Sequence, residues 1–375
     1  MQFIDLKAQY DALKSEIDIN MQDVLSSAAF IGGKYVKELE GQLAAFTGRK
    51  HCITCANGTD ALQLAFMALG VGEGDAVFAP DMTFISSTEP AAMFGAVSVF
   101  CDITPDTYTL DPASLERQIK AVLAEGRYTP KAVVAVDILG NPCDYDAISA
   151  LCEKYGLALI EDAAQSFGAE YHGKKACSFG RIATTSFFPA KPLGCYGDGG
   201  AVFTDDDAIN DLIRSLCVHG KGPGGKYDNI RIGMNSRLDN LQAAVLLPKL
   251  RALREYEMQQ RQAVAKWYST AFIGNFTTPF VAEGCQSAWA QYALLAKDTA
   301  QRDRIVAHLT EKGIPSMVYY PTPQHALPVF RAEPTYGEAF QNANDYCART
   351  FSLPMHPYLT MAEQETVIRA VLEAL

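Results

Sequence analysis

The chain has 375 residues, more than an average domain of about 100 to 200 residues, so we expect one large and one smaller domain. Hydrophobic residues make up 49% and charged residues 20%, which excludes disordered, collagen-like and disulfide-scaffold proteins. The net charge is -11 and no run of lysines or arginines occurs, so we expect no nucleic-acid partner.

Targeting and metal signals are weak. The first residues lack a basic region followed by a long apolar segment, and no run of about 18 apolar residues occurs, so we expect a cytoplasmic protein without a membrane partner. Ten cysteines over this length are typical of free thiols in a reducing compartment. Cys52 and Cys55 have the spacing of half a zinc site, but the sequence offers no second ligand pair, so we expect buried thiols and no metal.

Apolar periodicity predicts that helices and strands alternate over the first 220 residues. Helices are predicted over residues 11–26, 36–46, 61–70, 206–218 and from 111 onward. Strands are predicted over residues 51–56, 76–80, 97–100, 132–136, 157–160 and 201–204. Because these strands are almost continuously apolar, we predict an α/β fold whose mainly parallel sheet is covered by helices on both faces.

The second part of the chain predicts a small α+β domain. A long helix is predicted from Leu238 to about Tyr268, with a kink expected at Pro248. Strands are predicted over residues 288–295 and 314–320, with a helix over 302–312 between them. We therefore divide the chain into a large cofactor-binding domain, residues 1–250, and a small domain, residues 251–375.

Two residues indicate a chemical function. Asp162 follows the strand at 157–160, at the carboxyl end where open α/β sheets place their ligands. Lys191 lies between Pro189 and Pro192, and taken alone it is typical of a solvated turn. Pyridoxal phosphate needs a lysine amine for its aldehyde and an acid that keeps its pyridine nitrogen protonated. The pair therefore predicts this cofactor.

A phosphate site is predicted where residues 57–60 lead into a helix. The amides of Gly58 and Thr59, the Thr59 hydroxyl and the helix dipole suit a phosphate group, although alone they equally describe an ordinary helix start. A nicotinamide oxidoreductase is the competing reading of such a chain. It is disfavoured because no G-x-G-x-x-G joins the first strand to a helix, and the glycines between Gly194 and Gly200 precede a strand.

Three segments resemble the DegT-type sugar aminotransferases: EDAAQS at 161–166, SFFPAK at 186–191 and GDGG at 197–200. The resemblance implies a fold-type-I enzyme with a seven-stranded-type sheet that uses pyridoxal 5'-phosphate. It implies transfer of an amino group from glutamate, which leaves as 2-oxoglutarate, to a nucleotide-linked keto sugar for bacterial cell-surface polysaccharides or glycans. Some relatives carry histidine in place of the lysine and dehydrate sugars, so Lys191 favours transamination.

The sequence is most similar to members that aminate C3 of a UDP-linked 3-keto sugar, including 3-keto uronic acids. Two alternatives stay open. One is amination at C4 of a UDP- or dTDP-linked 4-keto-6-deoxy sugar, and the other is a cofactor-binding sensor without turnover.

The resemblance also implies the roles of individual residues. Catalysis would rest on Lys191 and Asp162, with the cofactor held by Gly58, Thr59, Phe84, Gln165, Ser186 and Asn235, and the substrate by Arg237, Tyr319 and Tyr320. In the family, the asparagine and the arginine reach across a homodimer with shared active sites. From the residues alone, Asn235 is equally a helix cap and Arg237 equally a surface ion pair.

The chain departs from the family pattern at two places. Tyr319 stands where many members have histidine, and because a phenol cannot become cationic near neutral pH, sugar recognition is expected to differ. Leu139 stands before Gly140 where many members have an aromatic residue.

Overall fold

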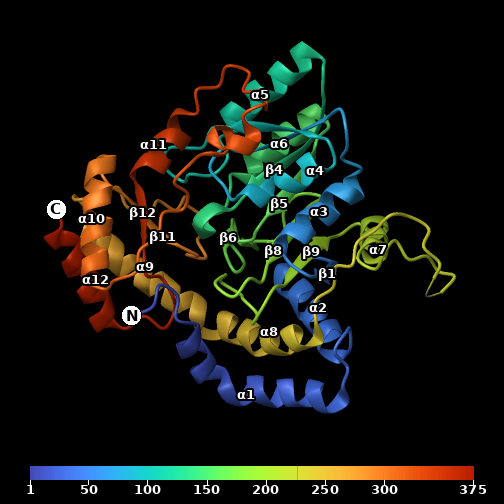
Figure 1. Cartoon of the computed structure of the whole chain (residues 1–375), viewed down its shortest axis with the longest axis horizontal. Coiled ribbons are helices and arrows are strands. Elements are labelled where there is room, and N and C mark those ends of the chain that lie inside the picture. The colour runs from blue at the N-terminus through green and yellow to red at the C-terminus, as the bar shows by residue number, and fades with distance from the viewer. Residues whose placement is uncertain (226) are drawn as a thin grey trace.

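A computed structural model of the protein describes residues 1–225 and 227–375. Its centre is a seven-stranded sheet in the order β1-β9-β8-β5-β4-β2-β3 (Figure 1). Only β9 runs antiparallel to its neighbours. The strands are β1 (His51–Cys55), β2 (Asp75–Pro80), β3 (Val97–Cys101), β4 (Thr129–Val136), β5 (Ala158–Asp162), β8 (Ile182–Ser186) and β9 (Gly200–Thr204). The predicted α/β fold with a mainly parallel sheet is confirmed.

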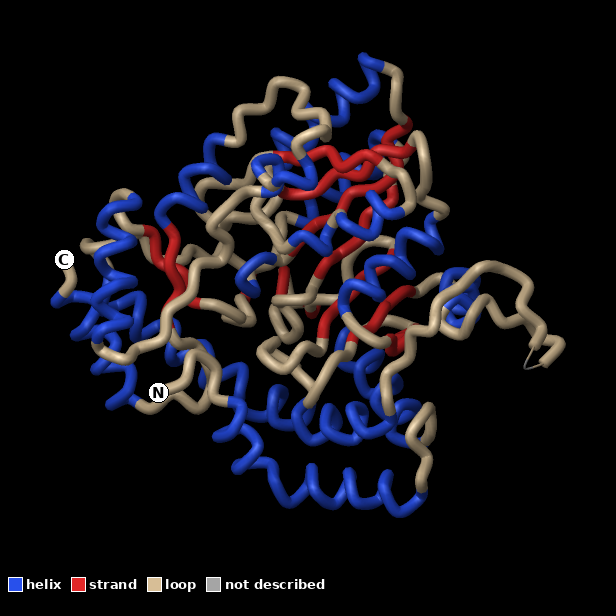
Figure 2. The backbone as a smooth tube through the Cα atoms, viewed as in Figure 1, coloured by secondary structure: helices blue, strands red, loops and turns tan. Residues whose placement is uncertain are grey.

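Helices cover both faces of the sheet, which lies between them in Figure 2. In β2, Val77 and Ala79 belong to the core on one face, whereas Ala76 and Phe78 belong to the core on the other. Side chains alternate along a strand, so a strand that is apolar throughout needs two covered faces. The covering helices are α2 (Lys34–Thr47), α3 (Gly58–Leu69), α4 (Glu89–Met93), α5 (Pro112–Glu125), α6 (Tyr145–Tyr155) and α7 (Asp207–Leu216).

A long helical segment runs beneath the sheet and beside α1 (Leu6–Ser27). It consists of α8 (Asn240–Ala252), a π-helical turn at Leu253–Glu257 and α9 (Met258–Phe272). Pro248 lies inside α8, where its missing N–H leaves the Ala244 carbonyl without its helical donor. The Asn20 side-chain amide donates to that carbonyl at 3.1 Å, so α1 compensates for the proline. A kink was predicted at Pro248, but the π-helical turn begins five residues later, at Leu253.

The C-terminal part contains a two-stranded sheet of β11 (Tyr292–Leu295) and β12 (Thr350–Leu353). Helices α9, α10 (Thr299–Glu311) and α12 (Met361–Glu373) enclose this sheet around a core of their own. Shorter elements are α11 (Gln341–Arg349), β6 (Glu170–Tyr171), β7 (Lys174–Lys175) and β10 (Cys285–Gln286), together with 3-10 turns at Ile85–Ser87, Ile138–Gly140, Gln324–Ala326 and Pro328–Phe330.

Two strand predictions in this part were wrong in extent. Residues 288–291 are not strand, because there the chain crosses residue 140, and the Ala288 N–H donates to the Gly140 carbonyl at 2.8 Å. Residues 314–320 form only an isolated bridge from Met317 to Ser352, since Pro315 removes a ladder donor.

The domain division at residue 250 falls within α8 and stays a proposal. The segment after Tyr320 returns to the large sheet, where Phe330, Phe340 and Tyr346 join the core beside α3. Among the described residues, no helix is long and apolar enough to cross a membrane.

Candidate functional site

The centre of the site is formed by Asp162, the last residue of β5, and Lys191, in the loop after β8. A turn presents Lys191, whose backbone N–H donates to the Phe188 carbonyl at 2.9 Å. Burial lowers the pKa of the Lys191 amine, and the nearby Asp162 carboxylate opposes that shift. Among the described residues, the amine makes no hydrogen bond. The fold thus brings a partly buried lysine and a buried carboxylate together, as a Schiff-base cofactor requires.

A buried lysine that the sequence did not reveal supports this loop. Lys249 of α8 is 1% exposed, donates to the Gly194 carbonyl at 2.7 Å and lies 4.3 Å from the centre of the Tyr196 ring. Burial lowers the pKa of Lys249 to about 8. The only signal in the sequence was a charged residue among the apolar positions of a helix. Through its hydrogen bond to Gly194, Lys249 of α8 therefore anchors the loop that carries Lys191.

The predicted phosphate site lies where α3 begins beside the end of β8. The Asn57 side chain caps the helix by accepting from the Asp60 N–H at 2.8 Å. The hydroxyl of Thr59 has no partner among the described residues and remains free for a ligand. A Cβ on Gly58 would lie 2.7 Å from the Ser186 Cβ, so Gly58 permits a close approach of the two segments. Gly58, Thr59 and Ser186 therefore surround one point at the positive end of a helix.

Replacing Gly58 with alanine is expected to weaken cofactor binding by about tenfold or more, because the added methyl group displaces Ser186 from the helix start. The measurement is the dissociation constant for pyridoxal phosphate, obtained by titrating the cofactor-free protein. Gly41→Ala is the matched control, since it also lies in a helix, α2, but has no atom within 4 Å of the added methyl group. Equal constants for the two variants would remove Gly58 from the phosphate site.

Aromatic and amide side chains lie beside the Lys191–Asp162 pair. The Gln165 amide accepts from the Leu139 N–H at 2.7 Å and donates to the Tyr320 hydroxyl at 3.1 Å. Phe84 is 52% exposed, and its ring lies 6.1 Å from that of Tyr320. Tyr319 packs against Tyr320 and Phe3. Gln165 is thus held rigidly, whereas Phe84 presents a free aromatic face.

Asn235 and Arg237 lie on either side of Ser236, whose hydroxyl accepts from the Ala56 N–H at 3.1 Å, two residues before Gly58. Both side chains are exposed, and neither makes a hydrogen bond or ion pair within the part of the chain that the structure describes. Arg237 lines a hollow of about 360 Å³ together with Ile31 and Arg214. Asn235 pairs through its backbone with Val218. The two predicted residues thus have no side-chain partner in their own chain among the described residues.

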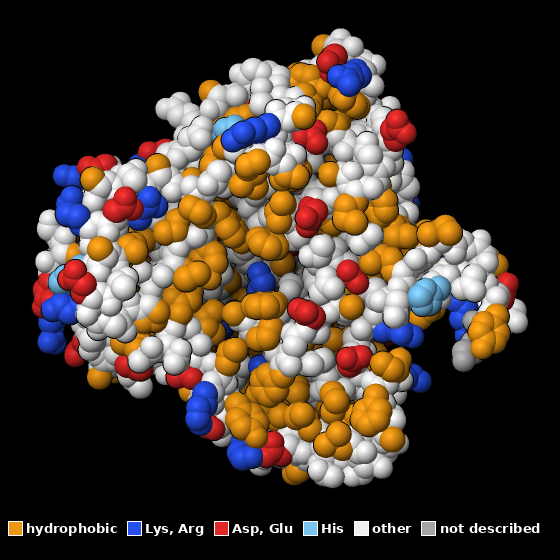
Figure 3. Space-filling view, viewed as in Figure 1, with side chains coloured by type: hydrophobic (Ala, Val, Ile, Leu, Met, Phe, Trp, Pro, Cys, Tyr) orange, Lys and Arg blue, Asp and Glu red, His pale blue; other side chains and the backbone are white. Residues whose placement is uncertain are grey.

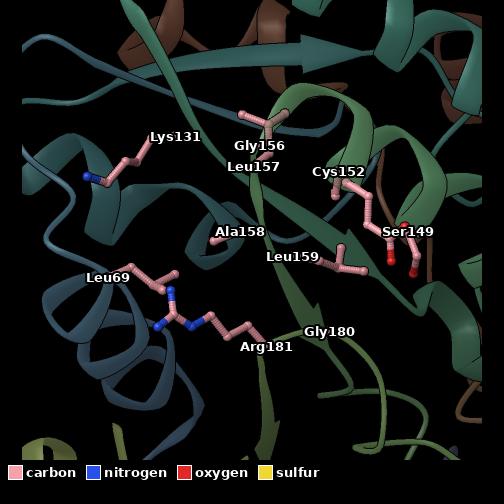
Figure 4. A pocket seen from close by; sticks show the side chains of 11 residues that line it. Leu69, Lys131, Ser149, Cys152, Gly156, Leu157, Ala158, Leu159, Gly180 and Arg181 are labelled. Atoms are coloured by element: carbon pink, nitrogen blue, oxygen red, sulfur yellow. The ribbon is translucent and has the colours of Figure 1, made fainter. Parts of the chain in front are cut away.

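A larger depression, of about 560 Å³, lies at the amino-terminal ends of the strands, away from the Lys191–Asp162 pair (Figure 4). Its lining includes Leu157 and Ala158, at the start of β5, whereas Asp162 ends that strand. Lys131 and Arg181 also line it, and both are paired with carboxylates elsewhere. The depression contains none of the predicted site residues.

Comparison with known proteins gives consistent results. Residues 11–372 match the model of the DegT/DnrJ/EryC1/StrS aminotransferase family. A UDP-2-acetamido-2-deoxy-3-oxo-D-glucuronate aminotransferase of Pseudomonas aeruginosa is 46% identical, over 99% of both chains.

Two solved structures share the fold. A DegT DnrJ EryC1 StrS aminotransferase from Brucella abortus superposes with a TM-score of 0.97 at 43% identity, covering 100% of this chain and 99% of that one. DesV of S. venezuelae, solved in complex with a ketimine intermediate, gives 0.92 at 35% identity, covering 99% and 97%.

Proposed function

The chain belongs to the DegT/DnrJ/EryC1/StrS aminotransferase family, and we propose that it transfers the amino group of glutamate to C3 of a UDP-linked 3-keto sugar. Membership makes it a sugar aminotransferase dependent on pyridoxal phosphate. The observation that carries the proposal is the convergence of Lys191 and Asp162 at the carboxyl end of β5. The choice of sugar is supported by the Pseudomonas relative, whose name specifies a UDP-linked 3-oxo sugar acid.

The described residues fit the cofactor. The phosphate of the cofactor suits the start of α3, where the Thr59 hydroxyl is unpaired among the described residues and Gly58 lies close to Ser186. The exposed ring of Phe84 offers a face for the ring of the cofactor. Asp162 would pair with the ring nitrogen and Lys191 would hold the aldehyde carbon. When bound, the cofactor supplies that aldehyde carbon for exchange of amines and a ring that accepts electrons from the breaking bond.

Lys191 would act as the base and acid of the reaction. Because burial lowers its pKa, a larger fraction of the amine is neutral near pH 7 and able to take a proton. In the first half-reaction it would remove the proton from the α-carbon of glutamate, which leaves as 2-oxoglutarate. In the second it would deliver a proton to the sugar carbon that gains nitrogen. The two substrates therefore use one site in turn.

Tyr319 and Tyr320 would contact the sugar nucleotide. Burial raises the pKa of both phenols, so they stay protonated and can donate to a hydroxyl or a diphosphate oxygen. The Tyr320 hydroxyl accepts from Gln165, which leaves its own proton for a ligand. Neutral donors would thus replace the histidine of other members.

The active unit is proposed to be a homodimer that shares its sites. Asn235 would reach the phosphate, and Arg237 the sugar, of the partner subunit, because both side chains are exposed and neither has a partner within the described part of its own chain. Large hydrophobic side chains are exposed on α1, in the loop after α1 and shortly before Asn235: Ile19, Leu25, Phe30, Ile31, Ile230 and Ile232. Ile31 pairs with Asp239, two residues from Arg237. Figure 3 shows hydrophobic side chains gathered over the helices at the lower end of the molecule, as an interface would require.

Arg237→Ala is expected to raise the KM for the sugar nucleotide by about 10- to 100-fold while kcat changes little, because a lost contact to an anionic group weakens binding throughout the reaction. The measurement is steady-state kinetics at saturating glutamate. Arg369→Ala is the control, since that arginine is also exposed but lies in α12. An unchanged KM would remove Arg237 from the site.

Subunit mixing tests the sharing directly. A dimer of one Arg237→Ala chain and one Lys191→Ala chain would place both defects in one site and leave the other site intact. At a sugar-nucleotide concentration well below the raised KM of Arg237→Ala, mixing the two variants after mild dissociation should therefore restore activity that neither has alone. If no activity returns although mixed dimers are shown to form, the sites are not shared.

The reaction itself is tested by visible absorption and product analysis. Glutamate should bleach the band of the bound cofactor, and UDP-linked 3-keto sugars should restore it, with nitrogen found at C3 by NMR of the product. Restoration only by 4-keto-6-deoxy sugars would move the amination to C4. A band that glutamate does not change would favour a sensor without turnover.

A further inference from the structure

Resting on the proposed function, we propose that Ser87 is a positioning residue that fixes the orientation and the ionised state of Asp162 through a buried chain of hydroxyl groups. Ser87 lies in the 3-10 turn Ile85–Ser87 and is 1% exposed. Its hydroxyl is 2.9 Å from Asp162 Oδ2. Ser87 would act on the cofactor only through Asp162, so its effect is indirect.

The two carboxylate oxygens of Asp162 are held by donors from different segments. Oδ2 accepts from Ser87, and Oδ1 accepts from the Ala164 N–H at 3.2 Å. One donor on each oxygen fixes the plane of the carboxylate group. That plane decides whether a lone pair faces the ring nitrogen of the cofactor.

The direction of the hydroxyl chain follows from the number of protons. Thr83 Oγ1 lies 2.9 Å from Ser87 Oγ, and both residues are buried. Ser87 has a single proton, and an ionised Asp162 has none to give. Ser87 must therefore donate to Asp162, and Thr83 must donate to Ser87. The opposite direction would require a protonated Asp162, so Thr83 and Ser87 can both donate toward Asp162 only while its carboxylate is ionised.

The hydroxyl groups of Ser87 and Thr83 matter because Asp162 is buried. Burial raises the pKa of Asp162, and the hydrogen bond from Ser87 is the largest influence that opposes the rise, ahead of the Ala164 N–H and Lys191. A carboxyl group that took up a proton could no longer hold a protonated ring nitrogen by charge. The hydroxyl of Ser87 therefore maintains the charge that the chemistry needs.

The same turn also carries the aromatic ring of the site. The Ser87 N–H donates to the Phe84 carbonyl at 3.1 Å, so the anchor on Asp162 also holds the turn from which Phe84 projects. From the C-terminal part, the Gln324 side chain donates to the Thr83 carbonyl at 2.6 Å, and its backbone N–H donates to the Asp81 carbonyl at 2.7 Å. The C-terminal part thus holds the segment that leads into the turn of Ser87.

The test uses the full-length protein loaded with pyridoxal phosphate labelled with 15N in the ring. For Ser87→Ala we expect the ring-nitrogen signal to shift toward the unprotonated form and kcat to fall about 10- to 100-fold, as loss of a hydrogen bond to a charged group implies. Ser87→Thr keeps the hydroxyl and should restore both. Ser98→Ala is the matched control, because Ser98 is 0% exposed in β3 and its hydroxyl has no partner among the described residues.

The outcomes separate the two proposals. A Ser87→Ala protein whose nitrogen signal and kcat equal those of Ser98→Ala overturns the role of Ser87 and leaves the proposed function intact. A wild-type protein that shows no cofactor signal refutes the proposed function and, with it, the inference about Ser87.

Discussion

Replacing Lys191 with alanine is expected to leave the protein folded and to lower kcat by about 10⁴-fold or more. The amine is both the group that holds the cofactor aldehyde and the group that moves the proton, so its loss removes two functions together. No other lysine among the described residues is placed near Asp162 to replace it. The measurement is the steady-state rate of 2-oxoglutarate formation at saturating concentrations of both substrates.

Two controls accompany this variant. Its circular dichroism and thermal unfolding should match those of the wild type, because the Lys191 amine makes no hydrogen bond within the described chain. Lys7→Ala, at a lysine whose side chain is 81% exposed, should keep full activity. Added methylamine should restore part of the lost rate by supplying a free base, whereas a near-native rate without it would contradict the assignment.

Asp162→Asn is expected to lower kcat roughly 10²- to 10⁴-fold, because removing one partner of a buried ion pair costs about 3 to 5 kcal/mol. Asparagine fills the same volume and can still accept from Ser87, but it carries no charge to keep the ring nitrogen protonated. The measurement is kcat at saturating concentrations of both substrates, together with the ring-nitrogen signal of the bound cofactor.

A variant of the neighbouring Glu161 serves as the control, because it replaces a buried carboxylate outside the proposed active site. Glu161 is 0% exposed and accepts from the N–H groups of Cys177 and Phe179, on the other side of β5 from Asp162. Glu161→Gln should lower the Tm, because one backbone donor loses a charged acceptor, while kcat stays within a few-fold of the wild type. Equal losses of kcat in the two variants would mean that Asp162 contributes only stability.

The sequence was sufficient for those parts of the fold that depend on local patterns. Continuous apolar strands alternating with helices predicted the covered parallel sheet, since this arrangement requires strands that are buried on both faces. Asp162 and Lys191 could be singled out because one follows a strand and the other is framed by prolines. Their proximity could not be derived from local pattern, because it depends on the pairing of β5 with β8.

Residues that act through tertiary contacts were not predictable. Ser87 and Lys249 touch partners far away in the sequence, Asp162 and Gly194, and neither has a distinctive neighbourhood of its own. Residues 314–320 have the composition of a strand, but β12 offers them only the bridge between Met317 and Ser352. Strand propensity describes a fit to a neighbour, so it fails where the neighbour is missing.

The antiparallel strand β9 has a consequence for how the chain is made. His51, in the first strand of the sheet, pairs with Thr204 in β9, and β9 is the only neighbour of β1 in the sheet. At a synthesis rate of about 5 to 20 residues per second, β1 waits for roughly 10 to 30 seconds before its partner leaves the ribosome. During that interval a five-residue strand with two thiols, Cys52 and Cys55, has no strand to pair with. Until β9 arrives, the β1 edge is therefore unpaired, and Cys52 and Cys55 lack the cover that buries them in the folded protein.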